Sequence, residues 1–322
     1  MYNLMFSIPI HEKLECVIDQ ILNIRSLNPN SAIVLHFSED FNYHNSLISR
    51  EKFERIIEEF FWGGVIINPI SVRTGRYDII QAHVENFNYV KDKVDFKFYC
   101  MCASNELFIK KGLYEHIKDY DCGFDLHNDT DLNDTWQAGI QAHKDNELNE
   151  MLHEIHGSKI MGSQIEGSFY CKSLFSQISD LITRHYDWRK MRVAYAREEV
   201  YFSTIAYNLM EKENIRVLDR GMFTWVPWKR KYTMNARLRE ISYLINRDTQ
   251  YFSVKRVERN INDCDRAYIR QLFGYYADEV KYLDIKEYKL SLLYVLEIIK
   301  EIRLHYNVVR KGIRKAQQII LR

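Results

Sequence analysis

Three carboxylates in this sequence, Glu166, Glu198 and Glu199, have the chemistry of a base that takes a proton from a hydroxyl group. Glu198 and Glu199 lie near the start of an amphipathic stretch, 197–212, which predicts a helix with two acids in its first turn. Neighbouring residues of a helix point about 100° apart, so only one of this pair can face a given cleft. A capping acid is the alternative for the pair, and a surface loop acid is the alternative for Glu166.

A pattern that could hold a divalent ion is Asp129-Thr130-Asp131, because carboxylate oxygens are the ligands that such ions prefer. It lies in a polar, acidic segment, 121–150, which has no clear period and predicts a long loop. An acidic turn is therefore the alternative. The His-Glu-Ile-His run at 153–156 lacks the zinc-binding H-E-x-x-H spacing. The six cysteines form no C-x-x-C pair, which favours reduced core residues over a disulfide or zinc role.

The elements that must position these residues alternate between strand and helix over the first hundred residues. Apolar and β-branched runs predict strands at 1–10, 31–37, 64–68 and 96–103. Amphipathic runs predict helices at 12–24, 51–61 and 77–90, and a strand or turn leads into another helix within 166–182. This alternation predicts a parallel sheet with crossover helices.

Parallel sheets of this kind bind ligands beyond the carboxyl ends of their strands. The ends expected here direct attention to the segments 38–40, 73–78 and 104–106. The side chains at or after these strand ends that we expect to contact a ligand are His11, Arg73, Arg76 and Ser104. A satisfied core histidine is the alternative for His11.

Six segments occur in an order that carries a resemblance. They are FSIPIHEKLE (6–15), TGRYDIIQA (74–82), CMCASNELFIKK (100–111), EGSFYCKS (166–173), EEVYFSTI (198–205) and YFSVKRV (251–257). Together, over roughly residues 4–260, they resemble the core-2/I-branching β-1,6-N-acetylglucosaminyltransferase family. The sequence departs from the family pattern at Asn105 and Glu106, where Gly and Asp are usual, and before Gly75, where a Trp is expected.

The resemblance implies an α/β, GT-A-like glycosyltransferase fold, in which helices flank a mostly parallel central sheet. It also implies inverting, metal-independent transfer from a nucleotide sugar, with UDP-N-acetylglucosamine as the first donor to try and with Glu199 as the base. The donor- and phosphate-binding residues that it suggests are Lys255, Arg256, Arg230, His11, Arg73, Arg76 and Ser104. The candidate acceptor-binding residues are Glu166, Gly167, Ser168, Trp225 and Trp228. Solvated surface charges are the alternative for the basic residues.

No metal cofactor is expected, because the position where most GT-A enzymes carry Asp-x-Asp holds Ser104-Asn105-Glu106, a poor metal clamp. Basic side chains would then neutralise the diphosphate. If Asp129 and Asp131 bind an ion instead, the protein is a metal-dependent transferase. A different class, an inactive nucleotide- or glycan-binding assembly protein, also stays open.

The expected organisation is a catalytic domain, 1–262, followed by a C-terminal helical extension, 263–322. Between 303 and 322 six basic residues and no acid are interleaved with apolar residues, which is typical of a helix that lies on an anionic membrane surface. A helix that packs on the catalytic domain with a solvated basic face is the alternative.

Net charge and the N-terminus set the expected partners and location. The chain has 45 Lys and Arg against 44 Asp and Glu, a balance that argues against a nucleic-acid partner. It carries no signal-peptide pattern and no apolar run long enough to span a membrane. We therefore expect a cytoplasmic protein, associated with the inner face of the membrane if the basic helix binds there. Its acceptor would be a glycan or glycolipid in surface polysaccharide synthesis.

Overall fold

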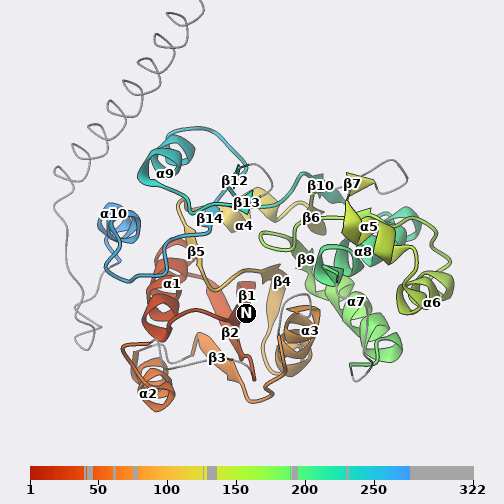
Figure 1. Ribbon diagram of the computed structural model, residues 1–322, viewed down its shortest axis with the longest axis horizontal. Coiled ribbons are helices and arrows are strands. Elements are labelled where there is room, and N and C mark those ends of the chain that lie inside the picture. The colour runs from red at the N-terminus through yellow and green to blue at the C-terminus, as the bar shows by residue number, and fades with distance from the viewer. Residues whose placement is uncertain are drawn as a thin grey trace, which may run out of the picture.

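The computed structural model describes residues 1–39, 41, 46–60, 63–74, 79–125, 127–128, 136–188, 190, 195–229 and 232–275. Within these residues a seven-stranded sheet forms the centre of the molecule (Figure 1). In spatial order its strands are β10 (Val217–Asp219), β6 (Cys122–Phe124), β9 (Phe169–Cys171), β4 (Phe96–Met101), β1 (Tyr2–Ile10), β2 (Ser31–Phe37) and β3 (Val65–Asn68).

Most neighbouring strands of this sheet run parallel. The pairs β1–β2, β1–β4, β2–β3 and β10–β6 are parallel, whereas β9 runs antiparallel to both β4 and β6. The predicted α/β architecture with a mostly parallel sheet is therefore confirmed. The strands and helices predicted over the first hundred residues all occur, with ends shifted by three residues or fewer.

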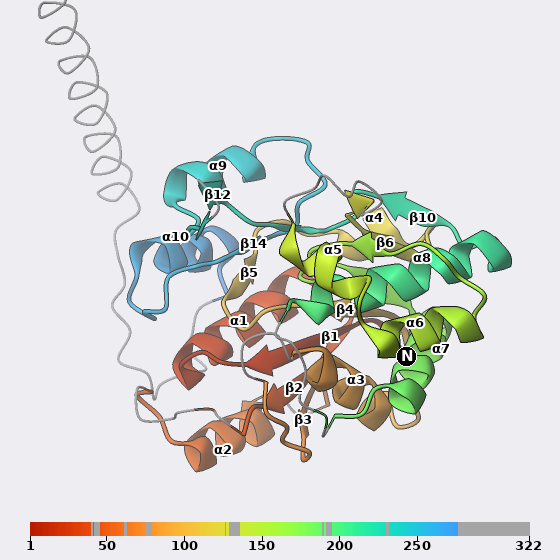
Figure 2. The same cartoon turned by 45° about the vertical axis from the view of Figure 1, so that its right-hand side comes forward.

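Both faces of the sheet are covered, which explains why its strands read as unbroken apolar runs. Alternate residues of β1 point to opposite faces, so Phe6 and Ile8 belong to one core and Met5 to the other. The first core packs against α1 (Leu14–Leu27) and α2 (Arg50–Phe60). The second packs against α3 (Ile79–Val90), α6 (Asn146–Glu154), α7 (Lys172–His185) and α8 (Tyr201–Glu213). Figures 1 and 2 show α1 and α3 on opposite sides of the strands.

A second, three-stranded sheet lies beside α1 and joins distant parts of the chain. Its order is β11 (Thr224–Trp225), β14 (Ser253–Lys255) and β5 (Glu106–Phe108). The remaining strands are β7 (His127–Asn128) with β8 (Met161–Gly162), and β12 (Trp228–Lys229) with β13 (Tyr232–Thr233). The remaining helices are α4 (Leu113–Ile117), α5 (Gln137–Ala142), α9 (Leu238–Ile245) and α10 (Cys264–Phe273). Among the described helices, none has the length and apolar character needed to cross a membrane.

The prediction of one long loop over 121–150 is wrong. This segment contains β6, which pairs with β9 and β10, and it contains α5 and the start of α6. β6 is only three residues long, so its pairing depends on partners far along the chain and leaves no local period. The start of α6 has a local cause, since the Asp145 carboxylate accepts hydrogen bonds from the backbone N–H groups of Glu147 and Leu148.

A buried ion-pair cluster fixes α10 on α1. Asp19 of α1 lies 2.7 Å from a guanidinium nitrogen of Arg266 and 3.3 Å from one of Arg270, and all three side chains are buried. α10 thus packs on α1 although it follows the expected boundary at residue 262. The division into domains stays a prediction, because residues 276–322, including the basic stretch 303–322, lie outside the described residues.

Replacing Asp19 by Ala should lower the free energy of unfolding by about 3–5 kcal/mol, because two guanidinium groups stay buried without their carboxylate. Urea denaturation followed by tryptophan fluorescence measures this loss. Asp180→Ala serves as the control, since Asp180 is half exposed in its pair with Lys91 and should cost less than about 1 kcal/mol. Equal losses in the two variants would contradict the assigned role of Asp19.

Candidate active site

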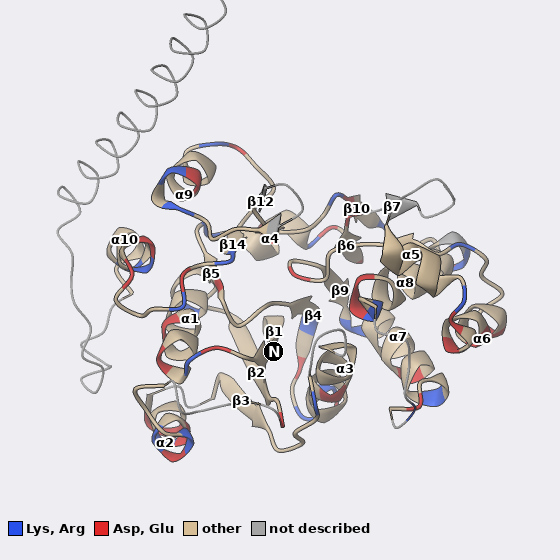
Figure 3. Cartoon of the chain, in the orientation of Figure 1, with Lys and Arg blue, Asp and Glu red and all other residues tan. Residues whose placement is uncertain are grey.

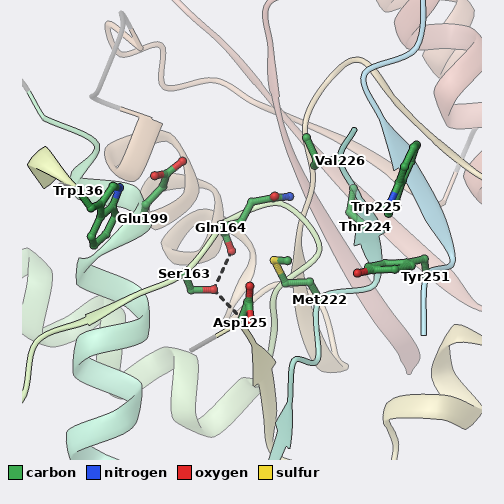
Figure 4. A pocket seen from close by; sticks show the side chains of 10 residues that line it. All are labelled: Asp125, Trp136, Ser163, Gln164, Glu199, Met222, Thr224, Trp225, Val226 and Tyr251. Carbon is green, nitrogen blue, oxygen red and sulfur yellow. Dashed lines mark hydrogen bonds between the residues drawn. The ribbon is translucent and has the colours of Figure 1, made fainter. Parts of the chain in front are cut away.

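A pocket of about 360 Å³ opens beyond the carboxyl end of β6 and beside the small sheet (Figure 4). Its lining residues are Asp125, Trp136, Ser163, Gln164, Glu199, Met222, Thr224, Trp225, Val226 and Tyr251. Glu199 and Trp136 lie on one side, Trp225 and Tyr251 lie on the other, and Gln164 lies between them. Aromatic side chains bordering a polar floor suit a sugar ring, which has apolar faces and hydroxyl edges.

Glu199 belongs to a short 3-10 helix, Arg197–Glu199, that precedes α8. Its backbone C=O accepts a hydrogen bond of 2.7 Å from the N–H of Ser163, which holds the side chain at the pocket. Burial raises the pKa of Glu199 to about 7, the charge of Glu166 raises it further, and the charge of Lys255 lowers it. A carboxylate with a pKa near neutral is well matched to accept a proton from a hydroxyl group.

The sequence predicts Glu199 in the first turn of a helix, where the helix dipole would favour the ionised carboxylate, but the structure places it differently. α8 begins only at Tyr201, after the capping position of Val200, so Glu199 lies outside its first turn. The dipole effect falls off within a turn, and the cost of removing the carboxylate from water is larger here.

Glu166 and Lys255 form an ion pair beside Glu199. Their side chains are 14% and 17% exposed, so water screens the pair only partly. Glu166 comes from the turn before β9 and Lys255 from β14, whose register pairs Lys255 with Glu106 of β5. The fold thus brings together three residues that the sequence singled out separately, while their catalytic and binding roles stay predictions.

Gly167 lets the turn that carries Glu166 pass close to β11. Its φ is +85°, and a Cβ there would lie 2.4 Å from the backbone nitrogen of Thr224. Its N–H donates to Met101 and its C=O accepts from Phe223, so the turn is fixed between the two sheets. The hydroxyl of Ser168 is buried and donates to the C=O of Ile165.

Replacing Gly167 by Ala should lower the free energy of unfolding. A left-handed backbone costs a residue with a Cβ about 1–3 kcal/mol. The clash of the new Cβ with Thr224 adds to this cost, so the total loss should be larger. Gly112→Ala is a matched control, since Gly112 has φ +91° but open space where its Cβ would lie. Chemical denaturation of both variants compares the two losses. If Gly167→Ala costs no more than Gly112→Ala, the turn does not depend on this close approach.

Glu106 occupies the position where a metal-binding carboxylate was considered and rejected. Its side chain is fully buried and accepts hydrogen bonds from the hydroxyls of Thr224 and Ser253, each 2.6 Å away, and from the N–H of Ala103 at 3.1 Å. Burial raises the pKa of Glu106 to about 7, and these hydrogen bonds lower it. Glu106 therefore links the small sheet to the end of β4.

Two of the predicted strand-end residues, His11 and Ser104, meet at the carboxyl edge of β1 and β4. The N–H of His11 donates to the hydroxyl of Ser104 at 3.1 Å, and the His11 ring lies 3.3 Å from the hydroxyl of Thr74. The N–H of Thr74 donates to the hydroxyl of Ser38 at 3.2 Å. Arg73 is exposed directly beside Thr74.

Only some of the basic residues assigned to the diphosphate lie within the described part of the chain. Arg256 follows β14 and lies close enough to the buried Glu12 to lower its pKa, although burial raises that pKa overall. Arg76 and Arg230 lie outside the described residues, as do Asp129 and Asp131. Trp225, one of the candidate acceptor-binding residues, lines the pocket, and Trp228 belongs to β12. Their role in acceptor binding stays a prediction.

Sequence reasoning missed eight residues of the pocket: Asp125, Trp136, Ser163, Gln164, Met222, Thr224, Val226 and Tyr251. Trp136 was the residue that the sequence could most easily have revealed, because a Trp in an otherwise polar segment needs an explanation. Tyr251 opens the YFSVKRV segment, where attention went to Lys255. Asp125 directly follows β6, a strand that the sequence did not reveal.

The solved structures that are similar to this chain include glycosyltransferases. Galactosyltransferase LgtC, in complex with donor and acceptor sugar analogues, matches with a TM-score of 0.43 and 9% identity, over 87% of this chain and 98% of its own. Glycosyltransferase GlyE of Streptococcus pneumoniae TIGR4 matches with a TM-score of 0.32 and 11% identity, over 70% of this chain and 46% of its own. The fold assignment itself rests on the strand order and helix packing described above.

Among proteins of known sequence, a chondroitin synthase of Pasteurella multocida (strain Pm70) is 26% identical over 232 residues. The match covers 68% of this chain and 23% of that protein, so the chain spans less than a quarter of its length. No family model matches the chain. The assignment to the core-2/I-branching family therefore stays a prediction.

Proposed function

We propose that this protein is an inverting glycosyltransferase that moves a sugar from a nucleotide-sugar donor to a glycan hydroxyl, with Glu199 as its base. The observation that carries the proposal is Glu199 itself, a half-buried carboxylate with a pKa of about 7 in a pocket walled by Trp136, Trp225 and Tyr251. A buried acid tuned to neutrality in a sugar-sized pocket fits proton abstraction better than it fits a structural role.

In the proposed reaction the acceptor oxygen attacks the anomeric carbon of the donor sugar. Its proton passes to a carboxylate oxygen of Glu199 as the new C–O bond forms. The bond between the anomeric carbon and the phosphate oxygen breaks, and the nucleoside diphosphate leaves with the electron pair. Attack from the face opposite the leaving group inverts the anomeric centre.

Positive side chains would stabilise the leaving diphosphate in place of a metal ion. Lys255 and Arg256 supply two adjacent charges, and Lys255 lies close enough to Glu199 to affect its ionisation. The residues at the position where metal-binding acids are usual support this proposal. Glu106 is buried and accepts hydrogen bonds from three protein donors, and Ser104 accepts one from His11.

For the donor we propose a UDP-sugar, with UDP-N-acetylglucosamine first, on the family resemblance alone. For the acceptor we propose a glycan or glycolipid of surface polysaccharide, lipooligosaccharide or capsule synthesis. A cytoplasmic location, with the basic segment 303–322 on the inner face of the membrane, belongs to the same proposal.

A screen of nucleotide sugars for binding and turnover, with and without EDTA, tests the proposal. Turnover that survives EDTA supports the metal-independent mechanism. Turnover abolished by EDTA and restored by Mn²⁺ or Mg²⁺ would replace it with the metal-dependent alternative through Asp129 and Asp131. If nucleotide sugars bind without turnover on any acceptor tried, the protein is a binding component and not a transferase.

A further inference from the structure

A second hollow, of about 1010 Å³, lies apart from the Glu199 pocket and shares no lining residue with it. It is bounded by the end of α3, the start of β4, α4 and the first turn of α7. Figure 3 shows α3, β4 and α7 next to one another, and their packing contacts agree. Four lysines line it, Lys91, Lys97, Lys118 and Lys172, against one acid, Asp92.

Among the described residues, carboxylates pair with two of these lysines and not with the other two. Lys91 pairs with Asp180 at 3.1 Å, and Lys118 pairs with Glu115 at 2.6 Å. Within the described part of the chain, Lys97 and Lys172 have no carboxylate at ion-pair distance. The Lys97 ammonium instead donates to the hydroxyl of Tyr114 at 2.6 Å, and that of Lys172 donates to the C=O of Val94 at 3.3 Å.

Lys97 and Lys172 also lie next to one another at the end of the β4–β9 pairing. The antiparallel register of β4 and β9 pairs Phe98 with Cys171, so the next residues are Lys97, at the start of β4, and Lys172, the first residue of α7. Like charges held close together repel. Both side chains are half-buried, which limits screening by water and strengthens the repulsion. An anion between them would remove it.

We propose that this hollow is a second binding site, for a phosphate group, held by Lys97 and Lys172 with the hydroxyls of Ser173 and Ser176. A phosphate carries nearly two negative charges at neutral pH, which matches two ammonium groups that pair with no carboxylate of the described residues. Lysine binds phosphate as a point charge, and both serines line the same hollow. The site does not depend on the proposed transferase activity. It accepts a phosphate carried by a soluble molecule or by a lipid headgroup.

Thermal unfolding and calorimetric titration with inorganic phosphate test the site, with sodium chloride of equal ionic strength as the reference. Phosphate should raise the midpoint temperature of thermal unfolding of the wild-type protein. Each of Lys97→Gln and Lys172→Gln should weaken phosphate binding by about tenfold, because a hydrogen-bonded charge is lost. Either substitution should also raise the midpoint in phosphate-free buffer of low salt, because it removes the repulsion. This second effect is the opposite of what mere damage to the fold would cause.

Lys93→Gln is the matched control, because Lys93 lies near the end of α3 over the ring of Tyr89 and does not line the hollow. Lys255→Met separates this site from phosphate binding near Glu199 and should keep the response. An equal response in wild type and in both hollow variants would overturn the proposal, and so would an equal effect of chloride on the wild type. If phosphate binds, a further experiment distinguishes a lipid headgroup from a soluble compound as the carrier of the phosphate. It is sedimentation with phosphatidylcholine vesicles, with and without phosphatidic acid.

Discussion

Replacing Glu199 by Gln should lower kcat for sugar transfer by about 10²–10⁴-fold, which is the usual contribution of a positioned general base. The amide keeps the shape of the side chain but cannot take the proton of the attacking hydroxyl. Donor affinity should change little, since the diphosphate is assigned to Lys255 and Arg256. The measurement is the initial rate of nucleoside diphosphate release with acceptor present, together with donor binding by calorimetry.

Glu198→Gln is the control, because Glu198 is the adjacent carboxylate and does not line the pocket. Its rate should stay within a few-fold of wild type. A Glu199→Gln enzyme with wild-type kcat would exclude Glu199 as the base. Glu166 would then be the next residue to test, because it is the other carboxylate close to this position.

The pH dependence of the wild-type rate follows from the same carboxylate. The base must be ionised, and burial raises the pKa of Glu199 to about 7. Below that pH, kcat/KM should therefore fall by about tenfold per pH unit, and above it the profile should level off. The residual activity of Glu199→Gln should lack this acidic limb.

Much of the first hundred residues was predictable because their elements are locally encoded. β1 and β2 are buried on both faces and are therefore unbroken apolar runs, while α2 shows a helical period. β6 was not predictable, because three residues in an acidic stretch form a strand only when β9 and β10 lie beside them. Its absence from the prediction hid Asp125 as well.

The candidate site was predicted as separate residues and not as an arrangement. Glu166, Glu199 and Lys255 were each proposed from the motifs around them, but their mutual electrostatic influence depends on tertiary structure. The pKa of Glu199 shows the same limit. Its position near a predicted helix start suggested an ionised acid, whereas burial, which no sequence motif reports, reverses the direction of the shift.

Glu106 shows how a departure from a family pattern can have a structural meaning. From the sequence, Ser104-Asn105-Glu106 was judged a poor set of metal ligands. In the structure, Glu106 joins the end of β4 to the strands that carry Trp225 and Lys255, through Thr224 and Ser253. The sequence could not show that Thr224 and Ser253 donate to this carboxylate, because both lie far from it along the chain.

Replacing Lys255 by Met should lower kcat by about 10²–10³-fold, because the charge that develops on the leaving diphosphate loses a preorganised cation. It should also move the acidic limb of the pH profile to higher pH. The charge of Lys255 lowers the pKa of Glu199 and the charge of Glu166 raises it, so removing Lys255 leaves the raising charge unopposed. The rate and the pH midpoint are measured in one set of initial-rate experiments.

The double variant Glu166→Gln/Lys255→Met separates the two roles of Lys255. It removes both members of the ion pair, so the midpoint should return toward that of wild type while kcat stays low. Lys93→Met, a lysine exposed at the surface, controls for the loss of a positive charge elsewhere. If the double variant recovers the wild-type rate, Lys255 acts by balancing Glu166 alone, and the diphosphate must be stabilised by other groups. If Lys255→Met loses rate with no movement of the midpoint, Lys255 contacts the donor without setting the ionisation of Glu199.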